Sequence, residues 1–335
     1  MRPSFSPRLV NGPFNDPGLF VPLTFRKRAL LFDIGDVSAL SPGDLLKTSH
    51  VFISHTHMDH FVGFDHLLRL LLGRPVDIHL FGPDGFLDNL GGKFRAYTWN
   101  LIHNYREALR LTATEIRPQK RITQVFDARK GFAPSAPVVE VRNDTIIHEE
   151  PAFCVRAEIL DHRIDCLAFA VQERFHVNIL KTQLMEQNLA VGPWVNRFKE
   201  LLYQKADPAT VINVPAAGST SAVTSYTLGA LAGKIARITP GQKFAYVTDT
   251  LYNETNREKI VSLAMDADQL FIEAAFLDED LPVAMDKYHL TARQAGTLAR
   301  EAGVRAITVF HHSPRYFGRG HLLTAEALKA FEGMV

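Results

Sequence analysis

Short apolar runs separated by turn-forming residues dominate the first part of the chain. RALLFDI at 28–34 and VFIS at 51–54 are apolar and bounded by turn formers, so each predicts a strand. FVGFDHLLRLLL at 61–72 has apolar side chains at helical spacing and predicts a helix that ends at Gly73. DIHLF at 77–81 predicts the next strand. The pattern therefore begins with strands and helices in alternation.

The middle of the chain changes from helical to β character. Residues 84–112 predict mainly helix, with an interruption near Asn89. VVEVR, TIIHE, FCVRAEIL and CLAFAVQ, between 137 and 172, predict a succession of strands. Residues 178–206 predict two short amphipathic helices, and residues 206–241, rich in Ala, Gly, Ser and Thr, favour no one element.

Strands and helices alternate again over the last third. KFAYVT, QLFIEA and AITVF predict strands, and the segments 254–265, 291–303 and 324–332 predict helices. The fold class is therefore α/β, with two β-sheets covered by helices on their outer faces. In such a layered fold, loops from the ends of both sheets can converge on one edge and carry polar ligands.

Composition indicates the class of protein, its compartment and the substrates it favours. The chain has 335 residues, of which 46% are hydrophobic and 22% charged, as in ordinary globular proteins. Cys154 and Cys166 lie in apolar runs and are expected to be core residues in a reducing compartment. The start MRPSFSPRLVNGPF lacks the apolar core of a signal peptide, and no apolar run is long enough to span a membrane, so we expect a cytoplasmic location and no membrane partner. The net charge of +1 weighs against a large RNA substrate unless a local patch attracts it.

The strongest chemical feature is His55-Thr56-His57-Met58-Asp59-His60, directly after the strand VFIS. Because side chains alternate along a strand, His55 and His57 project to the same side. Asp59 and His60 follow as the chain turns into the helix, so they can aim at a second point nearby. Imidazole and carboxylate ligands suit zinc, and also manganese or iron. A solvated histidine-rich loop is the alternative, and the apolar elements on either side disfavour it.

The motif HTHMDH resembles the HxHxDH motif of the metallo-β-lactamase superfamily, whose fold is an αββα sandwich. The resemblance implies two divalent metal ions and three further ligands, each at the end of a β-run. These are His162, Asp249 as the bridging carboxylate, and His311, for which His312 is the one competitor.

Segments further along resemble ribonuclease Z, the endonuclease that trims transfer-RNA 3′ ends. IEAA with Glu273, HLTA with His289 and the ending FHHSPRY resemble motifs of that family, and the segment from FHVNIL to KELL resembles its transfer-RNA arm. The family's FDCGEGTQ-like run is represented here only by FDIGDVSAL. We expect a single metallo-β-lactamase-like domain over 1–335 with an arm-like helical insertion around 175–206.

The resemblance implies endonucleolytic removal of the 3′ trailer from transfer-RNA precursors by a metal-activated hydroxide. Asp59 would orient or deprotonate the nucleophile, His289 would protonate the leaving oxygen, and Glu273 would hold His289 protonated. Arg315 is a candidate phosphate clamp, with a structural salt bridge as the alternative. The family also implies a homodimer. Two other functions are open: a hydrolase of a small phosphodiester, ester or lactone with the same ligands, and a metal-bound scaffold without activity.

Overall fold

The computed structural model describes residues 4–24, 26–217 and 223–334 of the chain. The chain divides into two compact units. Of the described residues, the larger unit contains 5–24, 26–147, 156–170 and 244–334, and the smaller one contains 4, 148–155, 171–217 and 223–243. All the candidate metal ligands belong to the larger unit.

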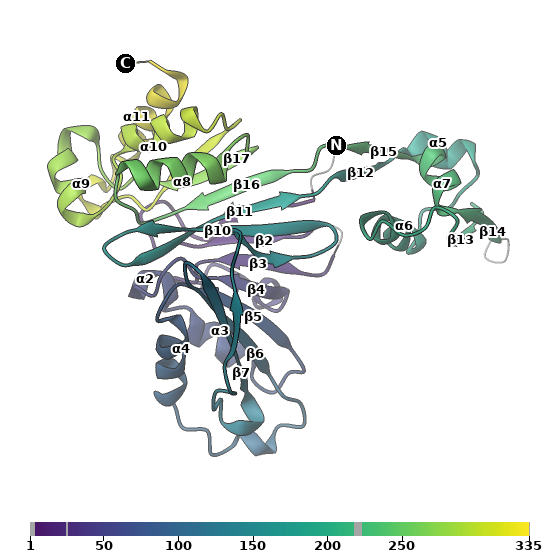
Figure 1. Ribbon diagram of the computed structural model, residues 1–335, viewed down its shortest axis with the longest axis horizontal. Helices are drawn as coiled ribbons and strands as arrows, with labels where there is room; N and C mark the ends of the chain where they lie inside the picture. The colour runs from purple at the N-terminus through teal and green to yellow at the C-terminus, as the bar shows by residue number, and fades with distance from the viewer. Residues whose placement is uncertain (1–3, 25, 218–222, 335) are drawn as a thin grey trace. The chain divides into compact units, whose positions relative to one another are not determined.

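One sheet has eight strands, in the order β1-β2-β3-β4-β5-β6-β7-β8, and its central strands β3 to β6 are parallel (Figure 1). The bounds are β1 Arg8–Leu9, β2 Leu19–Pro22, β3 Ala29–Phe32, β4 Thr48–Phe52, β5 Asp77–Gly82, β6 Arg110–Ile116, β7 Lys120–Asp127 and β8 Val138–Val141. The helices between them are α1 Pro42–Leu45, α2 Met58–Phe61, α3 Phe64–Leu71 and α4 Phe86–Arg95, with 3-10 turns at Ile102–Asn104 and Ala128–Lys130.

The second sheet has six strands, in the order β18-β17-β16-β11-β10-β9, with β16, β17 and β18 parallel. The bounds are β9 Ile146–Glu149, β10 Phe153–Asp161, β11 Asp165–Glu173, β16 Lys243–Val247, β17 Gln269–Glu273 and β18 Ile307–Phe310. The helices of this half are α8 Glu254–Ala264, α9 Leu281–Lys287, α10 Ala292–Glu301 and α11 Gly320–Glu332, with 3-10 turns at Asp278–Asp280 and Pro314–Tyr316.

The two sheets pack face to face through aromatic side chains. Phe32 on β3 lies 5.5 Å from Phe169 on β11 and 5.9 Å from Phe244 on β16, measured between ring centroids. Phe52 on β4 also contacts Phe169, at 5.8 Å. All four rings are almost fully buried, so they form the central layer of the sandwich.

Helices cover the outer face of each sheet, as the sequence predicts. Leu67, Leu68 and Leu71 of α3 pack with alternate residues of β3 and β4 in one core. Ile260 of α8, with residues of α10 and α11, packs on the other sheet, where small residues such as Ala245 let the helices approach closely. This αββα order confirms the predicted fold class.

The smaller unit has its own apolar core. Its elements are β12 His176–Ile179, α5 Lys181–Glu186, α6 Trp194–Tyr203, β13 Val211–Pro215, β14 Val223–Thr227, α7 Leu228–Ile235 and β15 Ala236–Thr239. Strands β12 and β15 pair antiparallel, with His176 opposite Thr239. Trp194, Phe198 and Leu201 form the buried face of α6. The segment expected as a helical arm at 175–206 therefore lies in the smaller unit, which also contains strands.

Some local predictions were wrong. Helix α4 continues through Asn89 and the glycines that follow, because its buried residues Phe86, Leu90 and Phe94 hold it to the core. Residues 96–109 contain no α-helix and only the 3-10 turn Ile102–Asn104, and the strands β6 and β7 and helix α9 were not predicted. Residues 218–222, within the segment that favoured no one element, lie outside the described part of the chain. Among the described residues no helix is long and apolar enough to cross a membrane.

Candidate metal centre

The candidate ligands gather where parallel strands end. His55 lies three residues after β4, Asp249 two residues after β16, and His311 directly after β18. His162 follows the last residue of β10. The carboxyl ends of parallel strands meet at one edge of a sheet, which is where side chains from distant parts of a chain can form a site. The fold thereby brings together residues that are more than 250 positions apart.

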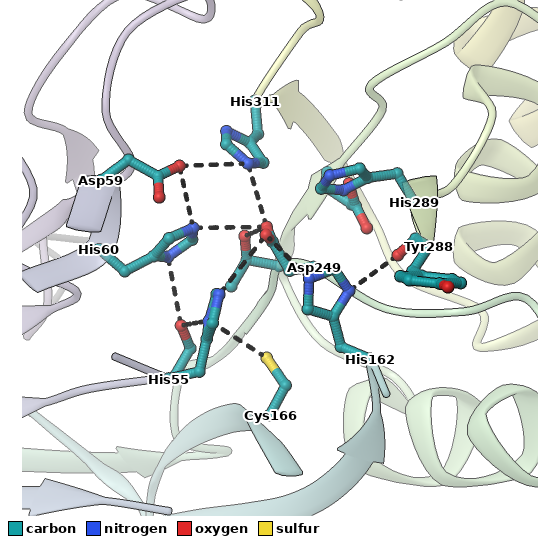
Figure 2. A network of polar contacts seen from close by, with 12 residues as sticks. His55, Asp59, His60, His162, Cys166, Asp249, Tyr288, His289 and His311 are labelled. Carbon is teal, nitrogen blue, oxygen red and sulfur yellow. Dashed lines mark hydrogen bonds and ion pairs between the residues drawn. The ribbon is translucent and has the colours of Figure 1, made fainter. Parts of the chain in front are cut away.

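Asp249 is the centre of the cluster, and its two oxygens face different histidines (Figure 2). Oδ2 lies 3.6 Å from Nε2 of His55 and 3.6 Å from Nε2 of His162. Oδ1 lies 3.5 Å from Nε2 of His60 and 3.1 Å from Nε2 of His311. A carboxylate with this arrangement can bind two cations at once, one through each oxygen.

The remaining residues of the motif complete two groups around this carboxylate. Asp59 Oδ2 lies 3.5 Å from His60 Nε2 and 3.8 Å from His311 Nε2. His57 is exposed, and its ring centroid lies 4.3 Å from that of His55. Around Asp249, two groups of ligand atoms within 4.8 Å of one another are His55, His57, His162 and Asp249, and Asp59, His60 and His311, and a third contains Asp249, His289 and His311.

The histidines are oriented by their second ring nitrogen. Nδ1 of His162 lies 2.8 Å from the carbonyl oxygen of Tyr288, and Nδ1 of His55 lies 3.1 Å from Oγ of Ser54. With a proton on Nδ1, the lone pair of Nε2 points into the site, which is the usual arrangement for a metal-binding histidine. Nε2 of His55 and of His60 are fully buried and have no hydrogen-bond partner. Buried polar atoms without partners are costly, so these nitrogens fit a bound cation.

The charges of the site also fit a cation. Burial lowers the pKa of His55 to about 2, so this imidazole is neutral and can bind a metal at any ordinary pH. Burial disfavours a charge on His60 too, but the carboxylates of Asp249 and Asp33 outweigh it and raise the pKa of His60 well above its usual value. Without a metal, this histidine therefore takes up the proton that a cation would displace.

His289 and Glu273 form a second functional unit beside the cluster. Nδ1 of His289 lies 2.7 Å from Oε2 of the fully buried Glu273. Burial alone would lower the pKa of His289, but the Glu273 carboxylate raises it to about 9. Glu273 is itself fixed, because its Oε1 accepts hydrogen bonds from the backbone nitrogens of Thr250 and Leu290. His289 is therefore a protonated imidazole at neutral pH, and its Nε2 is left for the site.

Asn256 on α8 links two of the loops that carry ligands. Its carboxamide makes two hydrogen bonds to the backbone of Asp161, next to His162. Oδ1 accepts from the amide nitrogen at 3.0 Å, and Nδ2 donates to the carbonyl oxygen at 2.9 Å. Nδ2 also lies 2.8 Å from Thr250 Oγ1 and 2.9 Å from the Leu251 carbonyl oxygen, after Asp249. Asn256 was not among the residues predicted, because a single asparagine in a helix has no motif around it.

Asp33, directly after β3, supports the site from the strand next to β4 and was also missed. The buried carboxylate accepts hydrogen bonds from the backbone nitrogen of Ser54 at 2.7 Å and from its hydroxyl at 2.8 Å. It also lies 2.9 Å from Nδ1 of His60 and accepts a 2.9 Å hydrogen bond from the hydroxyl of Tyr246. Its position at the end of a predicted strand was the one signal in the sequence.

Two glycines allow the motif to lie directly on the loop after β3. The amide nitrogen of Ile34 donates to the carbonyl oxygen of His60 at 2.9 Å. The amide nitrogen of Gly63 donates to the carbonyl oxygen of Ile34, also at 2.9 Å. A Cβ atom on Gly63 would lie 2.0 Å from the Gly35 carbonyl oxygen, and one on Gly35 would lie 2.2 Å from that of Asp59. Any side chain at either position would displace the ligands.

Two predicted candidates differ in their surroundings. His312, the competitor of His311, turns away from the cluster, and its Nδ1 lies 2.9 Å from the carbonyl oxygen of Ala274. Arg315 pairs with Asp280, with 2.8 Å between Nη1 and Oδ1. The Arg315 guanidinium thus forms a salt bridge, which was the alternative to a phosphate clamp. A phosphate would have to compete with Asp280 for this guanidinium.

His311 has an unfavourable backbone conformation. Its φ is 59°, in the left-handed region that residues other than glycine rarely adopt. Such strain is typically found at functional sites, where the surrounding structure imposes it. Here it turns the side chain toward Asp249, directly after β18 ends.

Comparisons with known proteins show which sequences this chain resembles. The Beta-lactamase superfamily domain matches residues 185–312, a range that includes Asp249, Glu273, His289 and His311 but begins after the HTHMDH motif. Ribonuclease Z of Deinococcus radiodurans is 28% identical over 316 residues, which are 93% of this chain and 91% of the relative. Ribonuclease Z of Bacteroides fragilis is 28% identical over 279 residues, with 83% and 75% covered.

Solved structures share the fold. The metallo-β-lactamase fold protein YhfI from Bacillus subtilis aligns with a TM-score of 0.52 at 16% identity, over 97% of this chain and 93% of its own. Human tRNase Z, short form, aligns with a TM-score of 0.50 at 17% identity, over 94% and 93%. The fold, the histidine and aspartate cluster and the ribonuclease Z relatives together make the chain a ribonuclease Z-like, metal-dependent hydrolase with the metallo-β-lactamase fold.

Proposed function

We propose that this protein is a two-metal phosphodiesterase that removes the 3′ trailer from transfer-RNA precursors. The observation that carries the proposal is the position of Asp249, whose two oxygens each face two histidines and which lies beside a protonated His289. A bridging carboxylate between two ligand groups fits two divalent ions, and a charged imidazole next to it fits an acid catalyst.

The proposed ligands follow from the two groups of ligand atoms. His55, His57 and His162 would hold one ion and Asp59, His60 and His311 the other, with one oxygen of Asp249 available to each. Four of these side chains come from one hexapeptide, so the strand β4 and the turn into α2 set most of the geometry. Nitrogen and carboxylate ligands suit zinc best, with manganese and iron as alternatives.

Two divalent ions would activate a water and neutralise the charge on the phosphate oxygens. The protein's own contribution is to place the phosphate between the cluster and His289. Asp59, 43% exposed at the edge of the cluster, orients the attacking water. His289 donates its Nε2 proton to the leaving 3′ oxygen, and Glu273 stabilises the imidazolium until that proton is transferred. The products are a 3′-hydroxyl and a 5′-phosphate.

The choice of transfer RNA rests on the relatives. The curated relatives named above are called Ribonuclease Z and align over most of both chains. The combination of Glu273 and His289 supports a reaction with a poor leaving group, since a ribose oxygen must be protonated as it leaves.

Cleavage of two substrates by the purified, metal-loaded protein tests the proposal. The first is a transfer-RNA precursor with a 3′ trailer, and the second is bis-(p-nitrophenyl) phosphate. We expect the precursor to be cut at the base of the trailer and the activity to disappear on chelation. Cleavage of the small diester alone would replace transfer RNA with a small phosphodiester. Inactivity on both by a protein that binds two metals would contradict the phosphodiesterase proposal.

The expected homodimer rests on the family resemblance. Light scattering of the purified protein would measure the mass of the assembly directly. A mass close to twice the 37.5 kDa of the chain is expected.

A further inference from the structure

Tyr288 and Arg163 form an aromatic–cation pair next to the candidate metal centre. The guanidinium carbon of Arg163 lies 5.3 Å from the centroid of the Tyr288 ring. Arg163 directly follows His162, and Tyr288 directly precedes His289. The Tyr288 ring centroid lies 6.3 Å from that of His162, at an angle of 87°. The pair therefore lies beside a candidate ligand and the candidate acid.

The backbone fixes both residues to the site. The carbonyl oxygen of Tyr288 lies 2.8 Å from Nδ1 of His162. Figure 2 shows this contact as a dashed line. The amide nitrogen of Arg163 donates to Oδ1 of Asp161 at 2.7 Å. Tyr288 and Arg163 cannot move away from the metal centre without also moving His162 or His289.

Apart from their contact with each other and that of the Tyr288 ring with His162, the two side chains have few partners. Over the described ranges, Arg163 makes no side-chain hydrogen bond or ion pair, and the Tyr288 hydroxyl makes no hydrogen bond. Arg315, in contrast, is paired with Asp280. Arg163 is exposed, and Tyr288 is 37% exposed. Five guanidinium donors and a phenol ring are thus presented to solvent at the edge of the site.

Nearby cations are engaged elsewhere, which distinguishes Arg163. It lines a hollow of about 620 Å³ together with Arg142 and Lys259. Arg142 donates to the carbonyl oxygen of Ala157 at 2.7 Å, and Lys259 donates to that of Ile159 at 2.6 Å. Unlike Arg142 and Lys259, Arg163 uses none of its guanidinium N–H donors within the described residues, so all of them can bind a ligand.

Both residues also have a strained backbone. The φ angle is 62° at Arg163 and 63° at Tyr288, where a residue with a large side chain is unfavourable. Glycine or asparagine would be the usual choice at such positions. A tyrosine and an arginine here are costly for folding, and over the described residues no side-chain hydrogen bond or ion pair of either residue offsets the cost.

The geometry points to a nucleotide subsite on this pair, which rests on the proposed phosphodiesterase function. The base of the nucleotide on the 5′ side of the scissile phosphate stacks against Tyr288 and the Arg163 guanidinium. Aromatic rings and guanidinium planes are the usual stacking partners for unpaired bases. Arg163 also donates to an oxygen of the next phosphate on that side, for which its planar fork is suited.

The side of the phosphate follows from the position of His289. His289 protonates the 3′ oxygen that leaves, so the leaving nucleoside lies next to it. Tyr288 is the adjacent residue, with its carbonyl held by His162. The subsite is therefore on the leaving side, and it makes the enzyme select a nucleoside over a small alcohol.

Two matched dinucleotides test this subsite. One carries bases on both nucleotides, and the other is abasic at the 5′ nucleotide. For the wild-type protein, loss of the base should lower kcat/KM about tenfold, within the range that base–aromatic stacking supplies. In Tyr288→Leu the two substrates should become nearly equal, and Tyr288→Phe should restore the difference. If Tyr288→Leu instead lowers both rates and keeps their wild-type ratio, the substitution has only disturbed His289 or His162. That result would overturn the proposal.

A binding measurement separates this proposal from the proposed activity. The probe is 2-aminopurine ribonucleoside 3′-phosphate, whose fluorescence is quenched by stacking. Quenching by wild type and by Tyr288→Phe, with little quenching by Tyr288→Leu, would support the subsite even if neither dinucleotide were cleaved. Equal quenching by Tyr288→Leu would overturn it even if the enzyme cleaved both. Arg163→Ala should weaken binding more than Arg163→Lys, which keeps the charge.

Discussion

At the residue scale, the ion pair of Glu273 and His289 determines the expected pH dependence. The pKa of His289 is raised from 6.5 to about 9 because the Glu273 carboxylate outweighs the effect of burial. Because the acid must be protonated to act, activity should fall as the pH rises through about 9. The same pair stabilises the fold fully below pH 6.5 and loses this contribution as the pH rises to about 9.

Glu273→Gln removes the charge and keeps the shape of the side chain. Burial should then lower the pKa of His289, and the alkaline limb of the kcat/KM profile should move to lower pH by one unit or more. Glu279→Gln, at an exposed carboxylate, is the matched control and should keep the wild-type profile. An unchanged limb in Glu273→Gln would mean that His289 is not the acid.

Asp249 and His289 should respond differently to removal, although they lie in one cluster. Asp249→Ala removes the carboxylate that faces four histidines, so zinc content and activity should fall together. His289→Ala should lower turnover on RNA by about 10²–10⁴-fold and leave the metal content nearly intact. Elemental analysis of each variant, with the exposed Asp286→Asn as control, measures the metal. Full zinc in Asp249→Ala would refute the bridging assignment.

At the element scale, α8 joins the ends of β10 and β16 through Asn256. Its buried carboxamide makes four hydrogen bonds to backbone and side-chain groups around Asp161 and Thr250. Asn256→Ala leaves these groups without partners, so it should cost about 1–3 kcal/mol of stability. It should also weaken zinc binding, because the loops of His162 and Asp249 are no longer tied together.

Asn253→Ala on the same helix is the control for this prediction. Asn253 is the N-cap of α8, and its side chain accepts a hydrogen bond from the Asn256 amide nitrogen at 2.8 Å. Its loss should cost a similar free energy of unfolding, about 1 kcal/mol, without a change in zinc affinity. Competition with a chromophoric chelator measures the affinity. Equal zinc affinity in both variants would show that Asn256 only stabilises the fold.

The contact between the motif turn and the loop after β3 leads to a steric prediction. Because a Cβ on Gly63 would lie 2.0 Å from the Gly35 carbonyl oxygen, Gly63→Ala should destabilise the protein by about 1–3 kcal/mol or more and reduce zinc binding. Gly92→Ala in α4 meets only the end of the Arg95 side chain, at 3.9 Å. It should stabilise by up to about 1 kcal/mol. Urea unfolding of both variants tests the pair, and a stable Gly63→Ala would contradict the close packing.

The elements that carry the site were predictable because each follows an apolar run with a clear period. The strands before His55, Asp249 and His311 were expected and are present as β4, β16 and β18. Strands β6 and β7 were missed because charged and threonine residues interrupt the apolar alternation in RLTATEI and KRITQVFD. Helix α4 was misjudged because its paired glycines disfavour a helix locally, whereas burial of one face stabilises it.

The supporting residues could not be predicted because their role depends on contacts between distant segments. Asp33 meets Ser54 and Tyr246 only when β3, β4 and β16 lie together. The pairing of Tyr288 with Arg163 joins residues that are far apart in the sequence and share no motif. A sequence pattern indicates residues close along the chain, and these contacts arise from the packing of the two sheets.

At the scale of the whole molecule, the two compact units differ in whether they contain residues of the candidate metal centre. The larger unit contains every residue of the candidate metal centre, and the smaller contains none. The smaller unit has its own core, around Trp194, Phe198 and Leu231. It presents exposed apolar side chains at Met185 and Val191. If the proposed function holds, the smaller unit is needed for binding a large RNA and not for hydrolysis of a small diester.

Excision of the insertion tests this division, and the pairing of β12 with β15 shows where to cut. Ile179 lies opposite Ala236, so a two-residue Asn-Gly turn can replace residues 180–235 and close the hairpin. We expect the shortened protein to bind zinc and hydrolyse bis-(p-nitrophenyl) phosphate at a rate near that of the full chain. Its kcat/KM on the transfer-RNA precursor should fall at least about tenfold, since contacts to the RNA backbone supply much of the affinity of such complexes. An equal loss on both substrates would instead mean that the insertion stabilises the catalytic unit, and no loss on either would remove it from RNA recognition.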